Sequence, residues 1–190
     1  MKHIVVFASG DGSNFAALAR YFESGRHGVT IDLLICDHQD AYVLTRAADF
    51  GIPSLTIDYH EFATKAAAEA YVLAQLPPCD LLVLAGFMRI VGPTLLAAFP
   101  DQIVNLHPAL LPSFPGRNGI QDAYAYGVKV TGVTVHYVDA GIDSGRIIAQ
   151  EPVRIQPEMS LAELVTAIHA VEHDLLPKTV ADLLTKERIA

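Results

Sequence analysis

The stretch HIVVFASGDGSNF, residues 3–15, decides the fold class that the sequence predicts. Residues 3–8 form a mostly apolar, β-branched run of strand length, which indicates a strand buried on both faces. The run ends in a loop that contains Gly10 and Gly12, and helical spacing of apolar residues begins at Asn14. A buried strand that passes through a glycine turn into a helix is the opening unit of an α/β protein.

The same alternation continues along the chain. Further strand-length apolar runs lie at residues 31–36, 54–57, 81–85 and 102–106, and helical spacing marks residues 14–22, 41–50, 60–76 and 93–99. Because strands that are apolar on both faces alternate with helices, we expect a Rossmann-like, doubly wound and mostly parallel sheet covered on both sides.

The pattern changes after Gly127. Residues 129–138 and 146–155 alternate polar and β-branched positions around a turn at 139–145, which predicts a late antiparallel strand pair. A final helix is expected from Ser160, where Ser160 and Glu163 spell a capping box, toward Leu184, with Pro177 as a bend or break. Since no repeat or linker interrupts the chain, we expect residues 1–190 to form one domain.

Composition excludes several classes of protein. The 190 residues are 52% hydrophobic and 18% charged, as in an ordinary globular protein. A formal charge of -8 without a dense basic run argues against nucleic-acid binding. The amino-terminal apolar run is too short for a membrane span or signal peptide, so we expect a cytoplasmic protein without a membrane partner, monomeric or homodimeric. Cys36 and Cys79 are then reduced thiols.

The loop at residues 9–14 is a candidate phosphate site. Its glycines allow close backbone approach, and the first amides of the following helix, with the helix dipole, favour an anion. Phe15 stands where the dinucleotide fingerprint needs its third glycine, which disfavours NAD. The simpler alternative is a helix cap in which Ser13 or Asn14 only satisfies amides.

The turn at residues 85–90, Ala-Gly-Phe-Met-Arg-Ile, follows the fourth expected strand. In an open α/β sheet, ligands bind outside the carboxyl ends of the strands, so this turn and the first loop should line one crevice. The alternative is an ordinary connection with Phe87 and Met88 in the core.

Asn105 and His107 close the fifth expected strand, before a loop stiffened by three prolines between residues 108 and 115. One residue apart in an extended segment, their side chains point to the same side. An amide and an imidazole suit stabilisation of an oxyanion and movement of a proton. Asp143, in the turn at 141–145, would supply a carboxylate partner. The alternatives are a structural histidine and an aspartate favoured by turn geometry.

His169, Glu172 and His173 match the inverted zinc-protease pattern on a helix. We expect no zinc there, because a third protein ligand is not apparent downstream.

Five motifs in this order resemble those of the phosphoribosylglycinamide formyltransferase family: residues 9–14, 84–90, 105–112, 114–116 and 141–145. The resemblance covers nearly the whole chain. It implies a single Rossmann-like domain that uses 10-formyltetrahydrofolate as a co-substrate, with small-molecule substrates only, no metal and no NAD. It also favours a cis peptide bond between Leu111 and Pro112.

The resemblance implies three groups of site residues. Asn105, His107 and Asp143 would be catalytic. The ribonucleotide would be held by Gly12, Ser13 and Asn14 at its phosphate and by Glu172 at its ribose. The folate pocket would comprise Lys65, Met88, Arg89, Ile90, Val91, Asn105, Asp139, Ala140, Gly141 and Ile142.

The implied reaction is direct acyl transfer from the folate to the amine of the ribonucleotide. Protonated His107 and the Asn105 amide would stabilise the oxyanion, while Asp143 would favour the protonated imidazole and help to move the proton. Lys65 is the nearest match to a family arginine at the folate tail. No function is assigned to Arg117, or to Arg146, which stands in place of an expected proline.

Three other functions are alternatives to this reaction. Methionyl-tRNA formyltransferase should carry a further basic carboxyl-terminal domain, and formyltetrahydrofolate hydrolase a regulatory amino-terminal domain; neither is expected in these 190 residues. A non-catalytic nucleotide-binding sensor would not require Asn105, His107 and Asp143 together.

Overall fold

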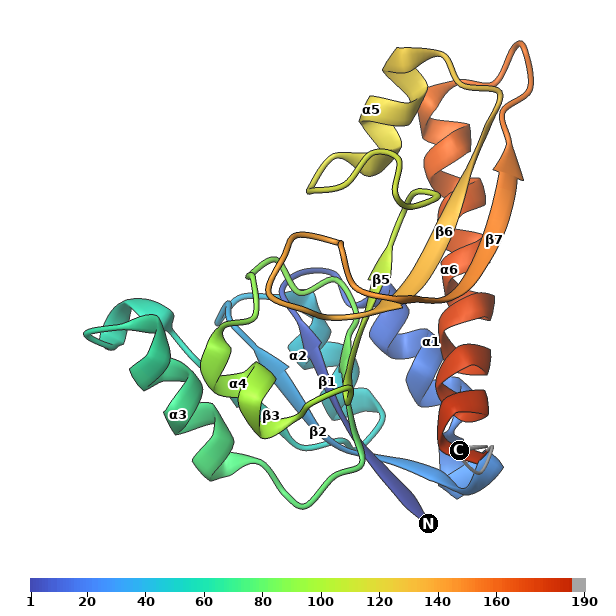
Figure 1. Ribbon diagram of the computed structural model, residues 1–190. Coiled ribbons are helices and arrows are strands. Elements are labelled where there is room, and N and C mark those ends of the chain that lie inside the picture. The colour runs from blue at the N-terminus through green and yellow to red at the C-terminus, as the bar shows by residue number, and fades with distance from the viewer. Residues whose placement is uncertain (186–190) are drawn as a thin grey trace.

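A computed structural model describes residues 1–185 of the chain. Its centre is a seven-stranded sheet in the order β3-β2-β1-β4-β5-β6-β7 (Figure 1). The first five strands are parallel to one another. Strand β6 pairs antiparallel with β5, and β7 pairs antiparallel with β6, as the sequence predicts. The strands are β1 (Lys2–Ala8), β2 (Val29–Cys36), β3 (Ser54–Thr56), β4 (Leu81–Leu84), β5 (Ile103–His107), β6 (Val130–Tyr137) and β7 (Ile147–Arg154).

Within residues 1–185 six α-helices surround the sheet: α1 (Ser13–Tyr21), α2 (Tyr42–Asp49), α3 (Lys65–Gln75), α4 (Pro93–Ala98), α5 (Gly119–Tyr126) and α6 (Leu161–Thr185). Short 3-10 segments lie at Glu23–Gly28 and Tyr59–Glu61. None of the helices within residues 1–185 has the length and apolar character needed to cross a membrane.

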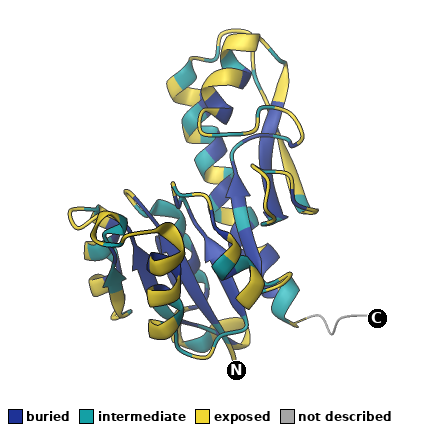
Figure 2. Cartoon of the chain, turned by 60° about the vertical axis from the view of Figure 1, so that its left-hand side comes forward, coloured by how far each residue is buried: buried dark blue, intermediate teal, exposed yellow. Residues whose placement is uncertain are grey.

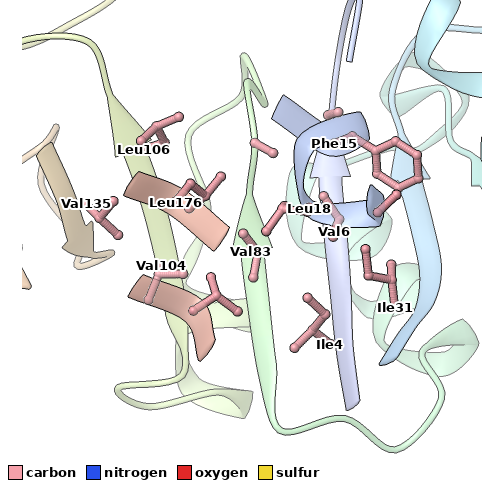
Figure 3. Packing of buried hydrophobic residues seen from close by; sticks show 14 of the residues in the cluster. Ile4, Val6, Phe15, Leu18, Ile31, Val83, Val104, Leu106, Val135 and Leu176 are labelled. Carbon is pink, nitrogen blue, oxygen red and sulfur yellow. The ribbon is translucent and has the colours of Figure 1, made fainter. Parts of the chain in front are cut away.

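The alternation of β1 divides the core into two layers, one on each face of the sheet. Ile4 and Val6 pack with Leu18 of α1 and Leu176 of α6 in the larger layer (Figure 3). Val5 and Phe7 face the opposite layer, which α3 and α4 cover. Figure 2 shows the central strands buried between exposed outer helix faces, whereas the edge strand β7 is largely exposed. Burial of β1 on both faces is what the opening run predicts.

The chain order creates a switch point between β1 and β4. After β1 the chain builds outward through β2 and β3, and then returns to place β4 on the other side of β1. In sheets of this kind the loops that leave the two strands diverge, and a crevice opens between them. The expected crevice therefore has its place at the carboxyl ends of β1 and β4.

The late elements differ in part from expectation. Helix α5 was not predicted, because its eight residues begin at Gly119 and carry no capping side chain. Helix α6 continues through Pro177, so the break is wrong; Pro177 is buried, and burial of the helix face outweighs one lost backbone hydrogen bond. The capping box is confirmed: the backbone amide of Ser160 donates to Glu163 Oε2 at 2.7 Å.

Candidate active site at the carboxyl ends of β1, β4 and β5

The crevice is held together by contacts between its two loops. The Ser9 amide donates to the Gly86 carbonyl at 3.1 Å, and the Met88 amide donates to Ser9 Oγ at 2.8 Å. The loop after β1 and the turn after β4 are thus joined by their backbones. The expectation that they line one crevice is confirmed, and Met88 is exposed rather than part of the core.

Two adjoining cavities occupy this edge of the sheet. The glycine-loop cavity, of about 580 Å³, is lined by Ser9, Gly10, Asp11, Gly12, Ser13, Asn14, Asp37, His38, Ala85, Gly86, Met88, Arg89, Arg117 and His169. The histidine cavity, of about 280 Å³, is lined by Leu84, Gly86, Phe87, Met88, Arg89, Ile90, Val91, Asn105, Leu106, His107, Pro108, Gly116, Arg117, His136, Val138, Asp139, Gly141, Ile142 and Asp143. They share Gly86, Met88, Arg89 and Arg117, so the two cavities have a common wall.

Gly12 shapes the first turn of α1. It occupies the left-handed region at φ 78°, and a Cβ there would collide with Val43. No side chain caps the amino end of α1, so the alternative of a simple Ser13 or Asn14 cap is not what the structure has. The first amides of α1 remain open toward an anion.

The last helix contributes a buried carboxylate to the same region. Glu172 is 4% exposed, and its Oε2 accepts from Asn14 Nδ2 at 3.0 Å and pairs with His169 Nδ1 at 2.8 Å. The hydrogen bond to Glu172 raises the pKa of His169, against the opposing effect of burial. Burial lowers the pKa of His173. Across residues 1–185, no set of three or more His, Cys, Asp or Glu side chains is arranged for a metal ion.

Asn105, His107 and Asp143 meet in the histidine cavity. His107, 3% exposed, has Nδ1 at 3.4 Å from Asp143 Oδ2 and Nε2 at 2.8 Å from the Phe114 carbonyl. Asn105 Nδ2 lies 3.5 Å from Asp143 Oδ1. Both ring nitrogens of His107 face acceptors, an arrangement that a doubly protonated imidazolium satisfies. The Leu111–Pro112 bond in the following loop is cis, as expected.

Asp143 is held as an anion. Hydrogen bonding from His136 lowers the pKa of Asp143; the Gly116 amide, which donates to Oδ2 at 2.7 Å, and the charge of His107 act in the same direction, against burial. Its backbone lies in the left-handed region at φ 51°, uncommon for a residue other than glycine. The turn therefore fixes the carboxylate where it meets His107.

His136 is a member of this group that the sequence did not reveal. Its Nε2 lies 3.2 Å from Asn105 Nδ2 and 3.6 Å from Asp143 Oδ1, and its Nδ1 lies 2.8 Å from the Tyr137 carbonyl. The register that pairs Asn105 with His136 brings it there. Only the register of two antiparallel strands could have found it, and a sequence does not fix that register.

The residues expected around a folate divide into two sets. Met88, Arg89, Ile90, Val91, Asn105, Asp139, Gly141 and Ile142 line the histidine cavity. Ala140 and Lys65 do not: Lys65 opens α3 and has its Nζ 3.9 Å from Glu69. Lys65 therefore lies beside Glu69, which caps α4 by accepting from the Gly92 amide at 2.6 Å.

Asp37, at the end of β2, was also missed. Its side chain is 1% exposed and pairs with Arg89 Nε at 2.6 Å. Although burial raises the pKa of Asp37, hydrogen bonds from Ser9, His38 and Arg89 hold it below the ordinary value. Arg89 also stacks over the Tyr59 ring at 4.3 Å. The charge of Arg89 is therefore neutralised by Asp37 inside the wall of the crevice.

Fold and site together define a Rossmann-like α/β enzyme with a glycine loop and open helix amides beside an Asn-His-Asp group. The model of the formyl transferase family matches residues 2–180. The chain belongs to the formyl transferase family.

Two relatives and one solved structure that match this chain are named phosphoribosylglycinamide formyltransferases. A Bacillus subtilis phosphoribosylglycinamide formyltransferase is 42% identical, covering 97% of this chain and 95% of the relative. The phosphoribosylglycinamide formyltransferase of Mycobacterium tuberculosis H37Rv is 40% identical, covering 96% and 85%. The crystal structure of the Bacillus halodurans phosphoribosylglycinamide formyltransferase superposes with a TM-score of 0.94 at 46% identity, over 99% of this chain and 98% of that one.

Proposed function

We propose that this enzyme transfers the formyl group of 10-formyltetrahydrofolate to the amine of N1-(5-phospho-D-ribosyl)glycinamide. The products are formylglycinamide ribonucleotide and tetrahydrofolate, in purine biosynthesis. The observation that carries the proposal is the junction of the two cavities, where an anion-binding loop and the group of Asn105, His107 and Asp143 share walls. The names of the relatives support the same reaction.

The ribonucleotide is proposed to lie in the glycine-loop cavity. Its phosphate takes the open amides at Gly12, Ser13 and Asn14, since backbone donors and the dipole of α1 favour an anion there. Glu172 accepts from a ribose hydroxyl. Asn14, which donates to Glu172, ties the phosphate loop to that carboxylate and holds it in place.

The folate is proposed to enter the histidine cavity. Met88 and Ile90 are exposed apolar side chains at its rim, and Val91 is buried behind them. The backbone of the turn from Asp139 to Ile142 supplies polar contacts to the pterin. Asp139 Oδ1 accepts hydrogen bonds from the Gly141 amide and the Ser144 hydroxyl, and these bonds keep the turn in shape. Asn105 faces both the folate and the reacting carbon. Lys65 reaches at most the outer tail of the folate.

In the proposed mechanism the amine of the ribonucleotide attacks the formyl carbon, and the carbonyl electron pair moves to oxygen. An N–H of protonated His107 and an N–H of Asn105 stabilise that oxygen. Since His107 Nε2 now faces the Phe114 carbonyl, this donor must be shared with the oxyanion or turned toward it. His136 Nε2 lies 3.2 Å from Asn105 Nδ2 and 3.6 Å from Asp143 Oδ1, so it helps to position both side chains.

Collapse of the tetrahedral intermediate re-forms the carbonyl and breaks the bond between carbon and the N10 atom of the folate. One proton must leave the attacking amine and one must reach N10. Asp143, kept anionic at neutral pH by the contacts described above, accepts or relays this proton, and its carboxylate faces the ring of His107. No step requires a metal, NAD or a covalent enzyme intermediate.

The remaining attributes follow from the proposed reaction. We propose that the chain acts as one formyltransferase domain on small molecules in the cytoplasm, as a monomer or homodimer. Neither nucleic acid nor a membrane takes part.

The test offers three acceptors with 10-formyltetrahydrofolate: glycinamide ribonucleotide, methionyl-tRNA and water. Formyl transfer to the ribonucleotide alone supports the proposal. Transfer to methionyl-tRNA would point to the tRNA-directed enzyme, and ligand binding without any turnover to a sensor.

A further inference from the structure

We propose that Arg117 binds the phosphate of the ribonucleotide and thereby sets the affinity of the glycine-loop cavity for its substrate. The inference rests on the proposed function, because it assigns the anion in that cavity to the ribonucleotide. It concerns a side chain outside the glycine loop and outside the group of Asn105, His107 and Asp143.

Arg117 lies where the two substrates meet. It belongs to the loop between β5 and α5 and is one of the four residues common to both cavities. Its side chain is exposed, and its Nη2 donates to the Met88 carbonyl at 3.3 Å, at the long end of hydrogen-bond distances. A guanidinium carries five N–H donors, so most of them are available to a ligand.

The carboxylates that line the glycine-loop cavity already have cationic partners. Asp11 pairs with Arg46, which lies outside the cavity lining, at 3.0 Å. Asp37 pairs with Arg89 at 2.6 Å and with His38 Nδ1 at 2.9 Å. Neither acid is free to neutralise a further cation at these distances.

The other basic side chains of the cavity are engaged in turn. Arg89 and His38 face Asp37, and His169 faces Glu172 at 2.8 Å. Arg117 has no carboxylate within ion-pair distance anywhere in residues 1–185. It therefore contributes the uncompensated arginine charge of this cavity.

The histidine cavity does not offer Arg117 an equivalent role. Its acids are Asp143, which faces His107 and His136, and Asp139, whose Oδ1 accepts hydrogen bonds from Gly141 and Ser144 but has no ion-pair partner among residues 1–185. A phosphate dianion is repelled there and attracted into the glycine-loop cavity. Arginine suits the task, since its planar fork can engage two phosphate oxygens at once.

The experiment compares Arg117→Gln with Arg146→Gln. Arg146 is an exposed arginine of the same part of the chain that stacks over Tyr137 and lines neither cavity. Calorimetry with ribose 5-phosphate measures anion binding without formyl transfer, and steady-state kinetics separates the two KM values from kcat. Arg117→Lys, which keeps the charge but loses the fork, is the conservative variant.

For Arg117→Gln we expect the Kd for ribose 5-phosphate and the KM for the ribonucleotide to rise about tenfold or more, and their salt dependence to weaken. The folate KM and kcat should stay within about twofold, Arg117→Lys should fall between, and Arg146→Gln should match the wild type. Equal Kd values for Arg117→Gln and Arg146→Gln, an effect confined to the folate KM, or no binding of ribose 5-phosphate to the wild type would each overturn the inference. Failure of the proposed function would appear separately, as a wild-type protein that transfers no formyl group.

Discussion

His107 Nδ1 lies 3.4 Å from Asp143 Oδ2, although the two residues come from a parallel strand and from the turn after an antiparallel strand. The contact exists because β6 pairs antiparallel with β5, and the turn that follows β6 folds Asp143 back toward Asn105 and His107. Neither residue is exposed enough to be solvated in its charged form without the other. The pair is therefore the chemical centre of the account.

Substitution at this pair should remove catalysis and leave the fold. We expect His107→Ala and Asp143→Asn each to lower kcat by about 100-fold or more, because the first removes the oxyanion donor and the second the proton acceptor. Steady-state assays measure kcat, and circular dichroism spectra compare the fold of each variant with that of the wild type. Near wild-type turnover in either variant would refute the mechanism even if the family is right.

His136 should act through Asp143. His136→Ala removes the hydrogen bond that His136 donates to Asp143, so we expect kcat to fall about tenfold with smaller changes in both KM values. His136→Gln, whose amide nitrogen can still donate, should recover part of the loss. A kcat for His136→Ala equal to that of the wild type would show that Asp143 needs no such support.

The two loop glycines should respond differently to a methyl group. Gly12→Ala meets Val43 and keeps a left-handed φ of 78°, so we expect the free energy of unfolding to fall by about 1–3 kcal/mol. Gly10→Ala is the matched control, because a Cβ there has nothing within 4 Å. Urea denaturation compares the two variants; equal stability would mean that the Val43 contact relaxes at no cost.

The His169–Glu172 hydrogen bond should appear in the titration of His169. Because Glu172 raises the pKa of His169 above 6.5, this bond stabilises the fold below that pH, and the contribution is lost as pH rises through the folded-state pKa. Glu172→Gln should lower the pKa of His169 toward 6.5, measured by NMR of the ring protons. An unchanged titration would mean that the contact does not persist in solution.

The sequence predicted those parts of the protein that local pattern determines. Residues 3–15 announced a buried strand, a glycine turn and a helix, and Ser160 with Glu163 announced the start of α6. Asn105 and His107 were found because a strand that ends in polar residues before a proline-rich loop is unusual. Local periodicity carries such information within one element.

Pairing between distant segments could not be predicted from local sequence patterns. His136 and Asp37 reach the site through strand register and burial, which no single stretch encodes. The resemblance assigned Lys65 and Ala140 to the folate site; neither lines the histidine cavity, and their contacts with folate stay a prediction. Helix α5 was not predicted, because its start carries no capping signal. The expected break at Pro177 does not occur, because buried packing along α6 tolerates the proline.

The most direct test of the account is the release of tetrahydrofolate from 10-formyltetrahydrofolate by the purified protein, measured with and without glycinamide ribonucleotide. We predict that release begins only when the ribonucleotide is added, with one formylglycinamide ribonucleotide formed for each tetrahydrofolate. Release at a similar rate without the ribonucleotide would identify a hydrolase and contradict the central claim.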